Sequence, residues 1–553
     1  MTSMASTLGR YRSPKKPLSS LLTRVTFIIL FVILFALFSM GLVRLYALGE
    51  YAVAIVCLIV GLSASYITLN KRLVAWRFLY PALLLIFLMM LFPIVYSVAI
   101  GFTNYSSKNL LTYERVVNYH LEQTYAEKKQ RFKFQLYQAD NQYQITLNDG
   151  SGLWLQTPFL TLNQPLDKAT EAGPKRAIPL AVISAAPSGE PLAMRDVIKL
   201  KAQLKTLALT RDNEPDLMMY GFREFLPLLP RYEIKQPDNL PMAERPNEFL
   251  YDNQDKRYLQ ADFNNGFYTY LNDAGEMTEK TLSPGFVTHV GWKNYHTIFA
   301  MDEDRKNLAK VALWTVSFAL LTVLMQFSLG MLLASLLNWH RVKGQRIFRT
   351  LLLIPFAVPA FISIMIFRAM FNSEFGDVNA LLEFLFGMRF EWYFNPWLAK
   401  LQVLLVNLWL GFPYFMLLAM GMLKSIPSDL YEAANMDGAG TWYKFRFITL
   451  PMIIKSLTPL LIMSFTFNFN NFLVIALLTR GGPRMDDATV LIGETQLLIN
   501  YIYDLANGSV LGYQAYGLAS ALSGFLFLVI ASISLWQFWL TREKSPRSEL
   551  QEH

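Results

Sequence analysis

The stretch PSDLYEAANMDGAGTWYKFRFITLP, from Pro427 to Pro451, is a polar interruption between two long apolar runs. Ser428 is a suitable helix N-cap, and Asp429 and Glu432 follow it in the first turn, where they face the positive end of the helix dipole. The glycine-containing segment 437–440 is expected to end that helix. The stretch therefore predicts a short helix that closes in a tight turn.

A second amphipathic helix is expected after the turn. Thr441 can cap it, and Trp442, Phe445 and Ile448 recur at helical spacing. Pro451 marks the return of the chain toward the next apolar run. From these residues alone, the stretch could also be an ordinary amphipathic loop.

Around this loop, eight apolar runs are long enough to cross a bilayer, which requires about 20 residues. They cover roughly residues 25–43, 52–69, 78–101, 310–337, 350–371, 398–423, 457–478 and 516–540. The 553 residues are 53% hydrophobic and only 16% charged, a composition typical of polytopic membrane proteins. The first run exceeds the apolar part of a signal peptide, about 7–15 residues, so we expect an α-helical membrane protein that retains it.

The net charge of +9 indicates membrane topology rather than nucleic-acid binding, because the basic residues cluster beside the apolar runs. The clusters are Arg10, Arg12, Lys15, Lys16 and Arg24, then Lys71, Arg72 and Arg77, and then Arg341, Lys343, Arg346 and Arg349. The alternate loops are more acidic. Basic loops face the cytoplasm, so both termini are predicted to be cytoplasmic and residues 105–306 to lie outside.

The outer segment is long enough to form a domain. Apolar residues alternate with polar ones in 132–136, 143–147 and 267–270, which predicts short antiparallel strands. Asp196 is a candidate N-cap for a helix that reaches Leu209. The segment contains no G-x-S-x-G or H-E-x-x-H motif and no cysteine nucleophile. We favour a docking surface for a soluble partner, although a folded spacer fits as well.

Metal and disulfide chemistry are not indicated anywhere in the chain. The single cysteine, Cys57, lies within an apolar run, and the five histidines show no ligand spacing.

The stretch SFTFNFNNF, Ser464 to Phe472, brings polar residues into the seventh run. Ser464, Asn468 and Asn471 are spaced by four and three, so on a continuous helix they share one face. Phe467 borders that face. Uncharged amides and a hydroxyl beside aromatic rings suit a neutral sugar. The alternative is that these side chains bond neighbouring helices.

The sixth run offers an opposing wall. Leu410-Gly411-Phe412-Pro413-Tyr414 places a glycine and a proline at its middle. Pro413 is expected to kink the helix, and freed carbonyls are tolerated where they line a cavity. The Tyr414 hydroxyl could then reach a ligand, or its ring could simply pack.

The loop residues Glu432-Ala433-Ala434, Gly438 and Ile448-x-Leu450-Pro451 resemble the EAA motif of ABC importer permeases. This resemblance implies a coupling helix that docks into a separate ATPase. The residues it assigns to that contact are Glu432, Ala433, Ala434, Asp437, Gly438 and Ala439. The sequence lacks the P-loop pattern G-x-x-x-x-G-K-[ST]. We therefore expect a non-enzymatic transport subunit without its own cofactor, with ATP-Mg bound by the partner.

The segments FTNYSS (102–107), LSPGF (282–286) and FNFNNF (467–472) resemble the larger permease subunits of maltose/maltodextrin importers, the MalF type, along nearly the whole chain. The resemblance implies a sugar site at Leu410, Gly411, Tyr414, Ser464, Phe467, Asn468 and Asn471. It also implies a MalG-type second permease, a MalK-type ATPase dimer and a periplasmic maltose-binding protein, all at the bacterial inner membrane.

The expected organisation is a cytoplasmic tail (1–24), three spans (25–104), a β-rich periplasmic domain (105–306), a permease core (307–540) with coupling loop 427–451, and a cytoplasmic tail (541–553). A permease for another neutral oligosaccharide is the alternative. A secondary transporter is disfavoured, since it would usually show repeats and intramembrane ionisable residues. A membrane-anchored enzyme would need a motif in the outer segment.

Overall fold

The computed structural model describes residues 18–47, 51–126, 130–139, 142–162, 176–185, 187, 189–212, 214–238, 240–300, 302–339, 342–486 and 491–541. The predicted basic residues Arg10, Arg12, Lys15, Lys16 and Arg341, and nearly all of the C-terminal tail, lie outside these ranges. The chain divides into two units, Met1–Tyr96 and Ser97–His553, which are described separately.

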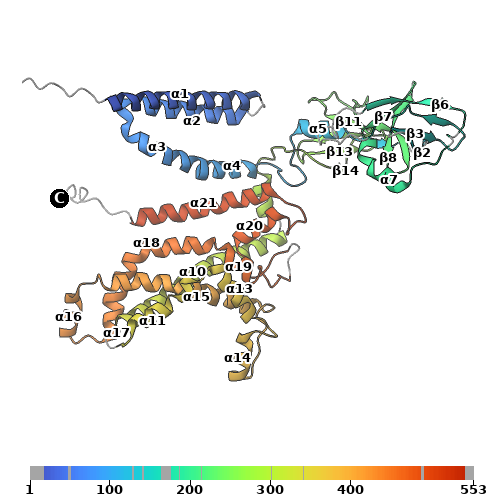
Figure 1. Cartoon of the computed structure of the whole chain (residues 1–553). Coiled ribbons are helices and arrows are strands. Elements are labelled where there is room, and N and C mark those ends of the chain that lie inside the picture. Colours follow the sequence, from blue (N-terminus) through green and yellow to red (C-terminus); the bar gives the residue numbers. More distant parts are fainter. Residues whose placement is uncertain are drawn as a thin grey trace, which may run out of the picture. The chain divides into compact units, whose positions relative to one another are not determined.

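The first unit consists of apolar helices (Figure 1). Its elements are α1 (Leu18–Ala47), α2 (Tyr51–Leu69), η1 (Lys71–Leu73), α3 (Val74–Ile86), η2 (Phe87–Leu91) and the start of α4 (Phe92–Gly101). The Tyr80 hydroxyl of α3 donates to the Val60 carbonyl of α2 at 3.0 Å and lies 2.7 Å from Ser63 Oγ. Polar groups in a bilayer need such internal partners, so α2 and α3 form a bonded hairpin.

The second unit begins with two antiparallel-rich sheets. Within the described residues the larger one has nine strands in the order β5-β7-β8-β9-β2-β3-β4-β6, with β1 paired to β9. The strands are β1 (Thr124–Ala126), β2 (Phe132–Ala139), β3 (Gln142–Asn148), β4 (Trp154–Gln156), β5 (Arg176–Pro179), β6 (Ala181–Ile183), β7 (Leu207–Arg211), β8 (Glu214–Tyr220) and β9 (Glu224–Pro230). We call this sheet, with α7 (Met194–Lys199) and α8 (Lys201–Leu204), the large lobe.

The predicted strand patterns are confirmed in the large lobe. Phe132, Phe134 and Leu136 of β2 are buried and alternate with exposed residues, and β3 buries Ile145 and Leu147. These side chains share one hydrophobic cluster.

The predicted helix from Asp196 to Leu209 is wrong. The helical part ends at Leu204, and Leu207-Ala208-Leu209 pairs between β5 and β8 as a fully buried strand. Sheet pairing here outweighs local helix propensity. Asp196 is not the N-cap of α7, which is Ala193, but lies in its first turn.

The second sheet is a five-stranded meander, with α5 (Tyr113–Leu121) preceding it in the chain. Its strands are β10 (Tyr232–Ile234), β11 (Phe249–Asp252), β12 (Arg257–Asp262), β13 (Phe267–Leu271) and β14 (Met277–Leu282). Residues of α5 share a hydrophobic cluster with residues of the sheet, and we call this assembly the small lobe. The strand predicted over 267–270 is confirmed as β13.

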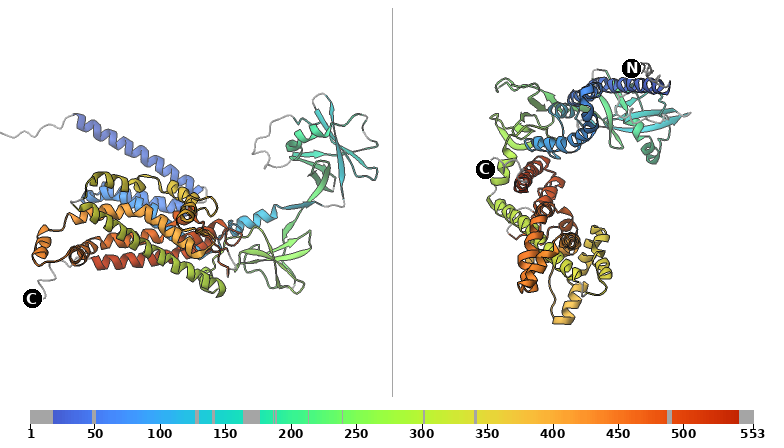
Figure 2. Two further views of the ribbon diagram at one scale, coloured as in Figure 1. Left: turned by 90° about the horizontal axis from the view of Figure 1, so that it is seen from below. Right: turned by 90° about the vertical axis from the view of Figure 1, so that its left-hand side faces the viewer.

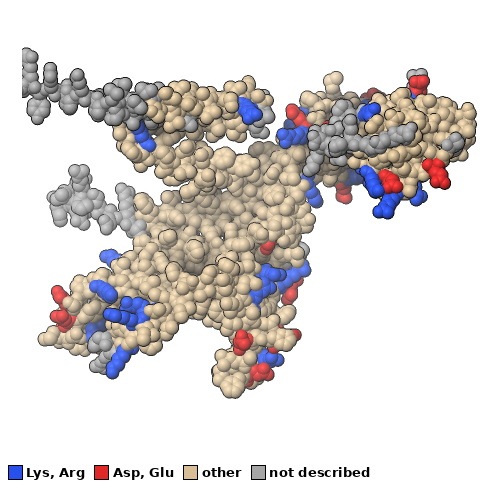
Figure 3. Space-filling model, viewed as in Figure 1, with Lys and Arg blue, Asp and Glu red and all other residues tan. Residues whose placement is uncertain are grey.

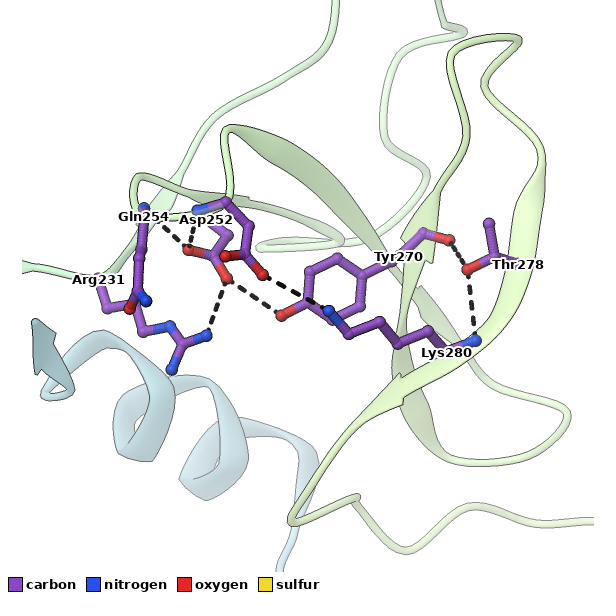
Figure 4. Close-up of polar contacts among 7 residues, drawn as sticks. Arg231, Asp252, Gln254, Tyr270, Thr278 and Lys280 are labelled. Atoms are coloured by element: carbon purple, nitrogen blue, oxygen red, sulfur yellow. Dashed lines mark hydrogen bonds and ion pairs between the residues drawn. The ribbon is translucent and has the colours of Figure 1, made fainter.

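The two lobes are joined at a buried carboxylate (Figure 4). Asp252 is fully buried, and its Oδ2 accepts from the Tyr270 hydroxyl at 3.0 Å and from Arg231 Nη2 at 3.3 Å. Arg231 connects β9 to β10, and its backbone N–H donates to the Gln123 carbonyl just before β1. The chain passes between the lobes at Gln123 and at Arg231, and these two residues are hydrogen-bonded to each other. Arg231 is also bonded to Asp252 in the core of the small lobe.

The remainder of the chain is a helical core. It contains α9 (Lys293–Ala300), α10 (Asp302–Asn338), α11 (Gln345–Leu352), α12 (Ile354–Ala357), α13 (Ala360–Met370), α14 (Asp377–Phe386), α15 (Pro396–Leu423), α16 (Ser428–Met436), α17 (Thr441–Lys444), η3 (Phe445–Thr449), α18 (Leu450–Phe469), α19 (Phe472–Leu478), α20 (Leu498–Asn507) and α21 (Tyr516–Thr541). Helices α10, α15 and α18 pack side by side (Figure 2). Gly330 of α10 allows close packing, because an added Cβ would crowd the backbone of Met416 on α15.

Each predicted apolar run contains at least one apolar helix among the described residues. Five helices are long and apolar enough to span a membrane, namely 74–101, 306–338, 396–423, 441–469 and 516–539; shorter apolar helices occupy 35–47, 53–69 and 360–370. The predicted run 350–371 is not one helix, because α12 ends before Val358-Pro359. Charged side chains gather toward the ends of the helical core, and the belt between them is nearly uncharged on the face shown in Figure 3.

Candidate substrate site and coupling loop

The seventh apolar run is interrupted inside the asparagine-rich stretch. Helix α18 ends at Phe469, Asn470 has φ −104° and ψ 23°, and Asn471 is the N-cap of α19. The Asn471 side chain accepts from the Val474 N–H at 3.4 Å. The prediction that Ser464, Asn468 and Asn471 share one face of a continuous helix is therefore wrong. Asparagine competes well for cap positions, and this explains the break.

The three residues nevertheless meet through Asn407 of α15. Its Nδ2 donates to Asn468 Oδ1 at 2.8 Å, and its Oδ1 accepts from Asn471 Nδ2 at 3.2 Å. Asn468 Nδ2 in turn donates to the Ser464 carbonyl at 2.9 Å. Thr322 of α10 joins through its hydroxyl, 3.3 Å from Asn407 Nδ2. We call this the amide network; helices α10, α15 and α18 and the N-cap of α19 contribute to it, and none of these side chains is charged.

Gln326 of α10 extends the amide network. Its Nε2 donates to the Asn407 backbone carbonyl at 2.7 Å. Gly411 makes room for this contact, because a Cβ at that position would overlap the Gln326 amide. Gly411 therefore lies at the α10–α15 contact.

The sixth span is not interrupted at Gly411 and Pro413. Helix α15 continues through Gly411 and Pro413 from Pro396 to Leu423. Phe412, Pro413 and Phe415 are buried, and packing against neighbouring helices lets a membrane helix accommodate a proline.

The predicted aromatic residues lie at the surface of the chain. Phe467 is 74% exposed and Tyr414 is 39% exposed. Neither side chain forms a hydrogen bond with another described residue; the Tyr414 ring packs edge-on against Phe415 at 5.4 Å between ring centroids. Leu410 is half-buried against a neighbouring hydrophobic cluster. Asn468, by contrast, is 3% exposed and Ser464 and Asn471 are half-buried, so the structure places the predicted residues in a buried group and an exposed group.

Sequence reasoning missed Asn407, Gln326 and Thr322. Each is a polar residue within an apolar run, which is a signal for a helix contact or a pathway. Thr322 and Gln326 lie four residues apart on α10, but no spacing links them to Asn407, and only the packed structure brings the three together.

The loop 427–451 folds as a helix, a turn and a second helix, as predicted. The turn is a Schellman motif, in which the Ala439 N–H donates to the Ala434 carbonyl at 2.8 Å and the Gly438 N–H to the Asn435 carbonyl at 3.0 Å. Gly438 has φ +75°, a conformation that favours glycine. The predicted caps are wrong by one residue, since Pro427 and Gly440 occupy the two N-cap positions instead of Ser428 and Thr441.

Most residues assigned to coupling are accessible. Glu432, Ala433, Asp437 and Gly438 are exposed, and Ala434 and Ala439 are half-buried in the turn. Met436 and Trp442 flank the turn and are 88% and 74% exposed. The Tyr431 hydroxyl lies 2.8 Å from Thr449 Oγ1, so α16 is fastened to the helix that returns into the core. The loop therefore presents exposed apolar and acidic side chains around a turn, and a hydrogen bond connects its first helix to the N-cap of α18.

Two family models match the chain. Residues 111–291 match the "Maltose transport system permease protein MalF P2 domain", and residues 326–545 match the "Binding-protein-dependent transport system inner membrane component". The first covers all the described helices and strands of both lobes, and the second covers the amide network except Thr322, together with the loop 427–451. They confirm an ABC importer permease fold with an inserted β-rich domain.

Similar proteins extend over nearly the full length. The maltose/maltodextrin transport system permease protein MalF of Vibrio cholerae is 39% identical over 90% of this chain and 91% of its own. The proteins of the same name from Klebsiella aerogenes and Escherichia coli K12 are 39% and 38% identical, each over 91% of this chain and 94% of their own. The chain therefore belongs to the MalF family of maltose/maltodextrin transport permeases, inner-membrane components of binding-protein-dependent transport systems.

Proposed function

We propose that this chain is the permease subunit that translocates maltose and maltodextrins across the bacterial inner membrane, powered by a separate ATPase. The observation that carries the proposal is the uncharged amide network at a helix break, flanked on the chain's surface by Tyr414 and Phe467. Amides both donate to and accept from hydroxyl groups, and aromatic rings cover the apolar faces of sugars. A charged substrate would find no countercharge there.

The sugar contacts divide between the two groups of residues. We assign direct contact with the sugar to Tyr414, Phe467 and Ser464, since these side chains are exposed or half-buried. Asn468 and Asn471 are assigned to the same site through their bonds with Asn407, which orient their amides. Leu410 and Gly411 complete the wall on α15. The exposed aromatic side chains would be covered by the sugar and by a second, MalG-type permease subunit.

The two ends of the helical core are assigned to different protein partners. The α16 turn supplies the contact with a MalK-type ATPase dimer, which would bind ATP-Mg. The residues of that contact are Glu432, Ala433, Ala434, Asp437, Gly438 and Ala439. The basic loops support a cytoplasmic location for this turn and for both termini. The two lobes then lie in the periplasm, where the maltose-binding protein delivers sugar.

The proposal is tested by uptake of labelled maltose in vesicles containing the complete complex, with ATPase activity measured in the same preparation. Tyr414→Ala and Asn468→Ala should each lower uptake about two- to tenfold, the effect of losing one neutral hydrogen bond of about 0.5–1.5 kcal/mol. Ser464→Leu should be more damaging, because it adds bulk as well as removing a hydroxyl.

Asn470→Ala is the matched control, because among the described residues the Asn470 side chain makes a single long hydrogen bond, 3.5 Å, to the Thr466 carbonyl. Normal uptake by the Tyr414 and Asn468 variants together with a defect at Asn470 would reject the proposed path. Uptake in the presence of competing sugars tests the alternative of another neutral oligosaccharide. If that oligosaccharide is transported and neither maltose nor maltodextrins compete with it, the substrate is different from the one proposed.

A further inference from the structure

A polar cavity, of about 550 Å³, lies where the small lobe meets the outer ends of the apolar helices. Its walls come from four segments that are far apart in sequence, namely 103–109, 264–283, the α9 region 290–297, and 511–518. It shares no residue with the amide network, so the proposed sugar path does not account for it.

The walls of this cavity are built by specific hydrogen bonds. Asn104 Nδ2 donates to the Asn265 carbonyl at 2.9 Å, and Asn109 Nδ2 to the Gly266 carbonyl at 2.9 Å. Asn294 Nδ2 donates to the Thr103 carbonyl at 2.8 Å. The Gly517 N–H donates to the Tyr105 carbonyl at 2.8 Å. The cavity is thus a bonded part of the fold and not a gap between loosely packed loops.

The charge of the cavity is positive and uncompensated. Lys108 and Lys293 line it, and no aspartate or glutamate does. Neither lysine forms an ion pair with a described residue; the Lys108 ammonium lies 4.4 Å from the centre of the Tyr513 ring. Asn264, Thr281 and Ser283 add exposed amide and hydroxyl groups. Two ammonium groups beside uncharged donors suit a phosphate that carries a polar substituent.

Aromatic side chains place the cavity at the membrane surface. Phe102 packs against Trp292 and Tyr295 at 5.0 and 5.1 Å between ring centroids, and Tyr105 packs against Tyr516 at 5.5 Å. The apolar helices 74–101 and 516–539 end and begin at this level. Tryptophan and tyrosine are enriched at membrane–water interfaces, so a headgroup in the cavity can keep its acyl chains in the bilayer.

We propose that this cavity binds the headgroup of an anionic phospholipid of the outer leaflet, with the phosphate between Lys108 and Lys293. The uncharged hydroxyl-bearing part of the headgroup faces Asn264, Thr281 and Ser283. The apolar side chains of Val290, Leu511 and Leu518, which also line the cavity, mark its hydrocarbon side. The bound lipid would stabilise the junction between the small lobe and the helical core.

The test uses the full chain in its assembled complex, placed in nanodiscs containing equal amounts of phosphatidylglycerol and phosphatidylcholine. Native mass spectrometry counts the phosphatidylglycerol that stays bound after the disc is removed. Each lysine near a membrane surface contributes about a fivefold preference for anionic lipid. Lys108→Gln with Lys293→Gln should therefore reduce retained phosphatidylglycerol severely, and Lys108→Arg with Lys293→Arg should restore it.

Lys235→Gln is the matched control, because Lys235 also lies over a tyrosine ring, 4.9 Å from the centre of Tyr251, and does not line the cavity; its retained lipid should equal that of the wild type. Equal phosphatidylglycerol on the double glutamine variant and the wild type would overturn the proposal. So would displacement of the lipid by inorganic phosphate alone, which would make the cavity a simple anion site, or by maltodextrin, which would make it a sugar site.

Discussion

Asn407 is the residue on which the buried amides of the core depend. It is 4% exposed and bonds Asn468, Asn471 and Thr322 at once. We expect Asn407→Leu to destabilise the complex by about 1–3 kcal/mol, because it leaves buried polar groups without partners. The loss should appear as a lowered melting temperature of the purified complex in detergent.

Asn470→Leu supplies the comparison, since Asn470 neighbours the same helix break but stands outside the amide network. Its melting temperature should stay near that of the wild type. If both leucine variants melt alike, the amide network contributes nothing particular to stability.

His120 of α5 makes the small lobe sensitive to acid. Its ring is buried, Nε2 lies 3.2 Å from the Pro284 carbonyl, and Nδ1 lies 3.4 Å from Gln123 Nε2. These contacts suit the neutral ring, with Nε2 donating and Nδ1 accepting. Burial lowers the pKa of His120 below its ordinary value of 6.5. Below about pH 6.5, His120 therefore binds a proton more readily in the unfolded chain than in the folded lobe. The free energy of unfolding of the small lobe falls as the pH drops through that region.

Limited proteolysis of the full chain at about pH 7.5 and about pH 5 checks this expectation. Cleavage within 111–291 should accelerate at the lower pH. His120→Gln, which cannot titrate, should weaken that acceleration, whereas the exposed His289→Gln should leave it unchanged. An unaltered pH response in the His120 variant would contradict the expectation.

At the residue scale, some polar residues of the amide network could be recognised from the sequence and others could not. Ser464, Asn468 and Asn471 stood out because they cluster within one apolar run. Asn407 and Gln326 form no such cluster with the residues they contact, which are 61 or more residues distant. Their local sequence does not identify these distant partners, so the centre of the amide network could not be predicted.

At the scale of single elements, the α16 turn carries the clearest requirement for glycine. Gly438 has φ +75° and no atom within 4 Å of an added Cβ, so a substitution there is opposed by backbone strain of about 1–2 kcal/mol and not by a clash. We expect Gly438→Ala to weaken ATP-driven uptake and Gly438→Trp to abolish it, because tryptophan also adds bulk on the face proposed to dock. Uptake and ATPase activity are measured together on the assembled complex.

Gly387 provides the matched control, since it ends α14 with φ +68° and equally open space. Gly387→Trp introduces the same strain away from the coupling loop and should preserve uptake. Equal defects at both glycines would reduce the effect at Gly438 to strain alone.

Element types could be predicted well where the hydrophobic period was strong. The β2 and β3 strands and the helix–turn–helix of 427–451 followed from alternation and glycine placement. The break after Phe469 did not, because the apolar run around it favours a continuous span. Asn470-Asn471 offers a cap signal in hindsight, but packing with α15 decides between a cap and a continuous helix. Helix α15 shows the opposite outcome, since it continues through Pro413.

At the scale of the whole molecule, the large lobe is a separable insertion. Its first and last strands are paired, with Thr124 opposite Pro230, so the chain enters and leaves the lobe about 5 Å apart. We expect that replacing residues 124–230 with a short glycine linker leaves the small lobe and helical core assembled. Crosslinking to the periplasmic binding protein should fall, and uptake should fall with it.

The comparison variant shortens only the loop around Gly150, between β3 and β4, and keeps both sheets. It should crosslink and transport as the wild type does. Retained crosslinking after removal of 124–230 would mean that the large lobe is a spacer and that the binding protein contacts another surface.

The contacts between residues 101–109 and the segment that leads into the last apolar helix can form only late in synthesis of the chain. The Ser107 N–H donates to the Gln514 carbonyl at 2.9 Å, and the Gln514 N–H to Ser107 Oγ across 407 positions of sequence. A ribosome adding about 5–20 residues each second needs about 20–80 s to cover that distance. Throughout that interval the outer end of the third span lacks its final neighbour, so a newly made chain stays open to proteases at this junction until translation is almost finished. A chain truncated before residue 510 should therefore be cleaved near residues 101–109 at a rate that the complete chain never shows.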